Sequence, residues 1–155
     1  MANGDNLKKL ASELLLPELE RQLKEEPELW PNLKGLFILT IAKKKKPMAV
    51  WYLLLQGKEV MPLITDDEEK ARSSAKTKVR VVKIQVEDSD LVNFITGGMT
   101  GVKAYMTGKI KVRGDLMLAQ RLEEVFEKAG GRKRALDFIK ENDQLRALAG
   151  GKAKL

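Results

Sequence analysis

The chain of 155 residues contains neither cysteine nor histidine. Without cysteine there is no disulfide framework, no thiolate nucleophile and no sulfur ligand for a metal. Histidine is the usual general base near neutral pH and the usual nitrogen ligand of zinc, so its absence disfavours most hydrolytic and metal chemistry. We therefore expect a protein that is not an enzyme, with no catalytic residue, no metal site and no cofactor.

Long apolar runs are also missing. The longest, Leu36–Ala42 and Met48–Leu55, have the length of strands and fall well short of the roughly 18 to 20 residues of a membrane-spanning helix. The first ten residues, MANGDNLKKL, lack the apolar centre of a secretory signal and include an acid that a mitochondrial presequence would avoid. We expect a single-domain protein that stays inside the cell.

Aromatic residues make up only 5% of the chain, whereas its formal net charge is +7. Such a charge suits nucleic acid, anionic lipid or simple solubility, but few aromatic residues argue against a base-stacking platform. Four consecutive lysines, Lys43, Lys44, Lys45 and Lys46, occupy a predicted turn. A solvated turn is the simpler interpretation and transient contact with anionic membranes is the alternative. No nucleic acid is expected, and a basic nucleic-acid-binding or protein-interaction module remains the alternative hypothesis.

The N-terminal region shows helical periodicity. Leucines spaced by three and four predict a helix over Asn6–Leu16, which Asp5 or Asn6 could cap. Proline suits a first helical position, so Pro17 is predicted to interrupt this helix and open a second one that ends before Pro27.

Three strands are predicted next. Leu33–Ala42 and Met48–Leu55 flank the lysine turn and read as an antiparallel hairpin, while Val60–Ile64 is a shorter strand that Pro62 places at an edge. Both faces of Met48–Leu55 are apolar, which predicts that this strand is covered on both sides. The polar stretch Thr65–Lys78 is predicted to be a mobile loop with room for one short helix around residues 67–71.

The second half of the chain alternates strands and helices. Apolar residues alternate in residues 82–86 and 110–112, which predicts two half-buried strands. Asp88 and Asp90 offer caps for a helix through Ile95, and Leu116–Ala129 has the widest apolar face of any predicted helix. Residues 134–149 are weakly amphipathic.

Residues Leu91–Phe126 resemble the later half of sterol carrier protein (type 2) domains. The family pattern runs from a short helix through a glycine-ended turn to a strand of the form GKxKxxG and a closing helix, and Gly108–Gly114 fits that form. The resemblance implies an α+β fold: a mixed five-stranded sheet with helices packed on one face and an apolar tunnel between. It also implies a non-enzymatic carrier of fatty acids, fatty-acyl-CoA, sterols or phospholipids.

The resemblance covers roughly residues 16–130, which leaves residues 1–15 as a partly helical N-terminal extension and 131–155 as a helical extension and tail. Methionine adapts to irregular ligands, so Met99 and Met106 are the preferred candidates for the tunnel wall. The full set of candidate lipid-binding residues is Leu19, Leu23, Phe94, Ile95, Met99, Val102, Tyr105, Met106, Leu116, Leu118, Leu122 and Phe126.

The chain ends in Ala153, Lys154 and Leu155, a small residue, a basic residue and leucine. This order matches the peroxisomal import address, and the preceding Gly150-Gly151 would let a receptor reach it. We expect a peroxisomal matrix protein with a cytosolic pool, whose partners are its lipid ligands and the peroxisomal import receptor.

Overall fold

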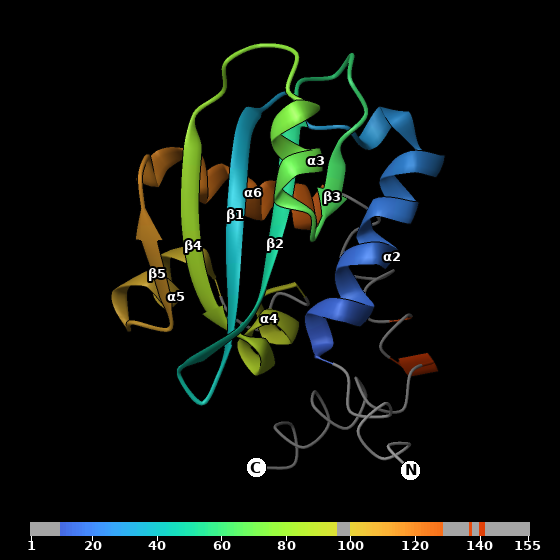
Figure 1. Ribbon diagram of the computed structural model, residues 1–155. Coiled ribbons are helices and arrows are strands. Elements are labelled where there is room, and N and C mark those ends of the chain that lie inside the picture. The colour runs from blue at the N-terminus through green and yellow to red at the C-terminus, as the bar shows by residue number, and fades with distance from the viewer. Residues whose placement is uncertain (1–9, 96–99, 129–136, 138–139, 142–155) are drawn as a thin grey trace.

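The computed structural model describes residues 10–95, 100–128, 137 and 140–141. Its centre is one five-stranded sheet in the order β3-β2-β1-β4-β5 (Figure 1). The strands are β1 (Lys34–Lys43), β2 (Lys46–Gln56), β3 (Leu63–Thr65), β4 (Val81–Glu87) and β5 (Ile110–Arg113). The helices are α2 (Ala11–Glu25), α3 (Glu68–Ser73), α4 (Asp88–Ile95), α5 (Gly101–Met106) and α6 (Leu116–Lys128), with a short 3₁₀ turn at Pro27–Leu29.

Neighbouring strands pair antiparallel except β1 and β4, which pair in parallel. The predicted mixed five-stranded sheet is therefore confirmed. The short strand β3 lies at one edge as predicted, but it begins at Leu63 rather than Val60, so Pro62 precedes the strand instead of lying within its ladder.

The β1–β2 hairpin turns through two lysines. Lys43 pairs with Lys46, so Lys44 and Lys45 form a two-residue turn, and both have positive φ angles, 54° and 68°. Residues other than glycine adopt this region at a cost of about 1 kcal/mol or more. The carboxylate of Glu87 accepts a hydrogen bond from each of the two lysine amides, at 2.9 Å in both cases. The last residue of β4 thereby stabilises the turn.

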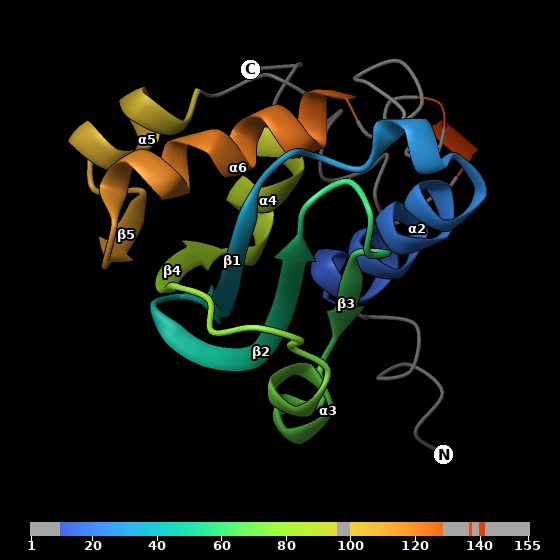
Figure 2. The same cartoon turned by 90° about the horizontal axis from the view of Figure 1, so that it is seen from above.

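A parallel pair needs a crossover connection, and the chain between β3 and β4 provides it. The short helix expected near residues 67–71 is present as α3, capped by the Asp67 carboxylate, which accepts from the Lys70 amide at 3.1 Å. After α3, the Gln56 side chain accepts from the Lys76 amide at 2.7 Å. The polar stretch is therefore the crossover that carries the chain across one face of the sheet (Figure 2).

Both faces are buried along most of β1 and in residues 52–55 of β2, which confirms two-sided cover for that part of the predicted strand, whereas Met48 is 56% exposed. On the face where α2, α4 and α6 pack, the buried strand residues of this pair are Phe37, Leu39, Ile41, Leu53 and Leu55. On the face that α3 covers, the buried cluster is Leu36, Ile38, Tyr52, Leu54 and Ala71 (Figure 2). The main core thus lies between the sheet and the larger helices, and a smaller one lies beneath α3.

The prediction of two N-terminal helices separated at Pro17 is wrong, because α2 runs without a break through this residue. Pro17 itself is exposed, while Leu16, Leu19 and Leu23 are buried in the main core. A proline inside a helix costs about 3 kcal/mol, and fully burying one leucine side chain contributes about 1.5–3 kcal/mol. Burial of leucines before and after Pro17 therefore outweighs the interruption.

The first turn of α2 is capped from a distant part of the chain. Leu10 occupies the N-cap position and has no side-chain acceptor. Instead, the buried Asp88 carboxylate accepts hydrogen bonds from the amides of Ala11, at 2.6 Å, and Ser12, at 3.0 Å. The candidate caps Asp5 and Asn6 lie outside the described residues. Asp88 therefore joins the start of α2 to the start of α4.

Strands β4 and β5 alternate as predicted, with Val82, Ile84 and Val86 buried. Gly114 then turns the chain into α6 with a φ angle of 116°, and a Cβ atom there would lie 2.9 Å from the Val81 carbonyl oxygen. A larger residue does not fit this turn. The predicted C-terminal helix over 134–149 falls outside the described residues, apart from 137 and 140–141.

Candidate ligand pocket

An apolar cavity lies between the sheet and the helices α4, α5 and α6. Strands β1, β4 and β5 form its floor with Leu39, Ile84, Val86, Ile110 and Val112. The helices form its roof with Leu91, Gly101, Val102, Tyr105, Leu116, Ala119, Gln120 and Leu122. The alternation of β4 and β5 points their apolar side chains to this face and leaves lysine and arginine on the other.

The wall of the cavity carries no charged side chain, and its side-chain polar groups are those of Gln120 and Tyr105. The volume of the cavity is about 60 Å³. A single water molecule needs about 10–15 Å³ on this scale, so the space holds only a few heavy atoms. A long acyl chain would enter only if the roof moved away from the sheet.

The mouth of the cavity lies where α5 meets α6. Three apolar lining residues are substantially exposed there, Val102 at 48%, Tyr105 at 44% and Leu116 at 38%, and Gln120 is exposed as well. The floor residues Leu39 and Val86, by contrast, are buried. The cavity therefore extends from the core to the surface between the two helices.

Local hydrogen bonds position two of the three roof helices, α5 and α6. The Thr100 hydroxyl accepts from the Lys103 amide at 3.1 Å and caps α5. The Asp115 carboxylate accepts from the Leu118 amide at 3.1 Å and caps α6, and it also pairs with Arg80 at 2.5 Å. The Leu118 amide, followed by Arg80, holds the pKa of Asp115 below its ordinary value. The capped turn fixes the end of α6 that carries Leu116.

Four of the candidate lipid-binding residues lie in the cavity wall: Val102, Tyr105, Leu116 and Leu122. The structure does not bring four others there. Leu19 and Leu23 are buried in the core beneath α2, Leu118 packs over Gly35, and Met106 is 78% exposed. The remaining four are Phe94, Ile95 and Phe126, whose side chains are outside the described part of the structure, and Met99, which is outside it altogether. That any of these residues binds lipid stays a prediction.

Sequence reasoning missed the floor of the cavity. It named no residue of β1, β4 or β5, although Ile84 and Val86 alternate with polar residues, as do Ile110 and Val112. This alternation shows which face of each strand is apolar, but the same pattern is typical of ordinary core. Only the gap between those strands and α5 distinguishes the floor from the rest of the core.

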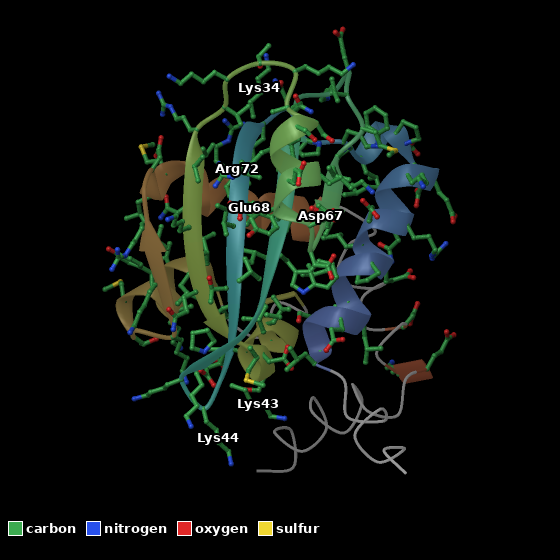
Figure 3. The ribbon with its side chains drawn as sticks, in the orientation of Figure 1. Lys34, Lys43, Lys44, Asp67, Glu68 and Arg72 are labelled. Carbon is green, nitrogen blue, oxygen red and sulfur yellow. The ribbon has the colours of Figure 1, made fainter. Side chains whose placement is uncertain are left out.

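Other charged clusters lie away from the cavity. Figure 3 shows Glu68 and Arg72 on α3 and Asp67 at its start, on the opposite face of the sheet, where Glu68 pairs with Arg72 at 2.8 Å. Figure 3 also shows Lys43 and Lys44 at the tip of the β1–β2 hairpin. Within the described residues, no group of three or more acidic side chains is arranged to hold a metal ion.

Within the described ranges, no helix has both the length and the apolarity that crossing a bilayer requires. The fold and the cavity together define a class of small α+β protein with an apolar cavity between one sheet face and its helices.

Similar proteins belong to the same class. Residues 16–127 match the model of the SCP-2 sterol transfer family. The chain is 23% identical over 116 residues to non-specific lipid-transfer protein-like 1 of Caenorhabditis elegans, covering 75% of this chain and 90% of that protein. It is 30% identical over 128 residues to sterol carrier protein 2 of Rattus norvegicus, covering 79% of this chain but 20% of that protein. Over 47 residues it is 38% identical to oleate-induced peroxisomal protein POX18 of Candida maltosa, 30% of this chain and 37% of that one.

Solved structures show the same fold. Sterol carrier protein domain 2 of Helicoverpa armigera superposes with a TM-score of 0.57 at 23% identity, covering 79% of this chain and 91% of that one. Sterol carrier protein-2 of Aedes aegypti, solved in complex with the C16 fatty acid palmitate, superposes with a TM-score of 0.54 at 18% identity, covering 78% and 98%. The chain belongs to the SCP-2 sterol transfer family and contains its lipid-transfer domain.

Proposed function

We propose that this protein is a non-enzymatic lipid carrier that holds the acyl chain of a fatty acid or fatty-acyl-CoA in the apolar cavity, with sterols and phospholipids as alternative ligands. The observation that carries the proposal is a cavity whose wall has no charged side chain and which opens to the surface between α5 and α6. It lies within the residues that match the family model, and a structural neighbour is a complex with palmitate.

The free energy of binding would come from apolar burial rather than from a dedicated polar site. Burying ten methylenes contributes roughly 8 kcal/mol before the costs of association. Because the cavity is small when closed, part of this gain is spent on moving the roof helices. Selectivity for chain shape would accordingly be broad, since Gln120 and Tyr105 supply the few polar groups of the wall.

Delivery to peroxisomal enzymes or membranes is the second part of the proposal. It is supported by the C-terminal Ala153-Lys154-Leu155 and by similarity to a protein named as peroxisomal. An import receptor would bind the tripeptide, leaving a cytosolic pool before import. Deletion of Leu155 from a fluorescent fusion is expected to leave the protein in the cytosol, and unchanged peroxisomal fluorescence would refute the address.

Ligand binding is tested by native mass spectrometry of the purified protein and by titration with palmitate. We expect an added mass of fatty-acid, phospholipid or sterol size that delipidation removes and palmitate restores. A variant that fills the cavity, Ala119→Phe, should lose this adduct. Ala75→Phe places the same side chain under the opposite sheet face, beside the α3 cluster, and should keep it.

Either of two outcomes would contradict the carrier proposal. The first is a clean apo mass that added palmitate leaves unchanged, which would favour an interaction module. The second is equal palmitate binding by Ala119→Phe and wild type, which would place the ligand somewhere other than this cavity. Circular dichroism of both variants is the control that checks whether each retains the fold.

A further inference from the structure

Large apolar side chains gather on the surface around the mouth of the cavity. We call the set Val102, Tyr105 and Met106 of α5 with Leu116 and Met117 of α6 the apolar rim. Met106 and Met117 are 78% and 76% exposed, the two highest values among the large apolar side chains that the structure describes. Exposed apolar residues that gather in this way, rather than scatter singly, usually mark an interaction surface.

The rim is continuous with the interior of the cavity. Val102, Tyr105 and Leu116 line the cavity and are also partly exposed. Met106 follows Tyr105, and Met117 follows Leu116, so each methionine lies next to a residue at the mouth. The helices α5 and α6 that carry the rim lie side by side at the β5 edge of the sheet (Figures 1 and 2). A partner on this surface would contact the entrance directly.

The charge around the rim has one predominant sign. Residues 100–122 include five cationic side chains, all exposed, and one acidic side chain, Asp115, which pairs with Arg80 and caps α6. Lys103 on α5 and Lys109 before β5 are nearest the rim in the chain; Lys111 and Arg113 of β5 lie on the sheet face opposite the cavity, and the Arg121 side chain donates to the Asn32 carbonyl oxygen.

This cationic surface extends to the lysine hairpin. Lys45 lines one cleft together with Lys109 and Lys111, at the end of β5 where α5 stops. Glu87 and Asp90 line the same cleft, so three cations face two carboxylates there, and the Glu87 carboxylate also accepts the hydrogen bonds of the hairpin amides. The hairpin and the start of β5, which follows α5, therefore contribute cations to one cleft.

We propose that the apolar rim is a docking surface for an anionic phospholipid bilayer. Flexible methionines would enter the boundary between headgroups and acyl chains, and the surrounding lysines would contact anionic headgroups, as on interfacial amphipathic surfaces. Docking in this orientation places the mouth of the cavity against the acyl chains. The purpose of the contact rests on the proposed carrier function, whereas binding to the bilayer is measured separately from ligand binding.

The test is co-sedimentation of the full chain with vesicles of phosphatidylcholine containing phosphatidylserine, and with vesicles of phosphatidylcholine alone. We expect binding to the anionic vesicles that weakens when salt is added. Met106→Asp and Met117→Asp should each weaken partition into these vesicles by about tenfold or more, because each removes apolar burial and adds like charge. Met61→Asp makes the same charge change beside β3, at the opposite edge of the sheet, and should weaken partition by less than about threefold.

Three results would overturn the proposal. Wild type that does not sediment with anionic vesicles has no such surface. Equal losses for Met61→Asp and the two rim variants would mean that net charge alone decides binding. If replacing Lys43–Lys46 with glutamine abolishes vesicle binding while the rim variants bind as well as wild type, docking belongs to the hairpin. Palmitate binding, measured in parallel, should be unchanged in Met106→Asp and Met117→Asp, so that failure of docking is distinguished from failure of the carrier function.

Discussion

The buried carboxylate of Asp88 should contribute strongly to stability through the start of α2. It accepts hydrogen bonds from the first two amides of the helix, those of Ala11 and Ser12, which have no carbonyl partner within the helix. Substitution Asp88→Ala leaves both amides without this acceptor in a buried setting. Each unsatisfied donor costs about 1–3 kcal/mol, and loss of a negative charge at a helix N-terminus costs about 0.5 kcal/mol more.

We therefore expect Asp88→Ala to lower the free energy of unfolding by about 3 kcal/mol or more, and Asp88→Asn, which retains one acceptor oxygen, by about half as much. For a chain of this size, 3 kcal/mol corresponds to a fall in melting temperature of about 6–12 °C. Denaturation with urea measures the first quantity, and a thermal scan measures the second. The exposed Asp66→Ala is the control and should change stability by less than about 0.5 kcal/mol.

Hydrogen exchange gives a second, local test of the same bonds. The amides of Ala11 and Ser12 should exchange faster in Asp88→Ala, while those in the middle of β1 should exchange at a rate set by global stability. A loss of stability below about 1 kcal/mol, with unchanged exchange at Ala11 and Ser12, would refute the reasoning and would mean that other groups replace Asp88 as acceptor.

Two further predictions concern a helix interior and a surface carboxylate. Pro17→Ala should raise the free energy of unfolding by about 1–3 kcal/mol in urea titrations. Alanine restores an amide donor in the interior of α2, and little packing is lost because the Pro17 side chain is exposed. An unchanged free energy of unfolding would mean that α2 accommodates the proline at no cost. Hydrogen bonding from the Leu118 amide and pairing with Arg80 lower the pKa of Asp115 in the folded state. The stability that the charged carboxylate contributes is therefore fully present above pH 3.8, the ordinary pKa of the group, and is lost as the pH falls through the lower pKa of the folded state. The difference in unfolding free energy between wild type and Asp115→Asn should accordingly be largest near neutral pH and shrink below 3.8, and a difference that is constant with pH would contradict this.

Much of the candidate site was predictable as apolar surface but not as a cavity. The alternation in β4 and the apolar face of α6 indicate inward side chains at Ile84 and Leu122, and both are buried. Core and cavity walls have the same composition, so sequence reasoning chose Met106 for the tunnel wall, yet the structure places it on the surface. A methionine near a helix end can face either way, and only the packing of α5 against β5 and α6 decides which.

What the sequence by itself determined is most of the local structure, while its resemblance to a known family indicated the class of fold. Periods of two and of 3.6 depend on near neighbours, so they predicted the helices α4 and α6 and the strands other than β3, which begins later than predicted. The failure at Pro17 has the same origin, because local propensity cannot weigh leucine burial on either side of a proline.

Tertiary structure decided the features that depend on distant residues. It brought Asp88 to the first turn of α2, Glu87 to the hairpin of Lys44 and Lys45, and three strands and three helices around one cavity. These contacts join segments whose separation along the chain leaves no periodic signal, and each forms only when the parallel pairing of β1 with β4 has set their positions. The cavity in particular exists because the side chains do not fill the space between the sheet and the helices, and no single segment specifies how much space is left.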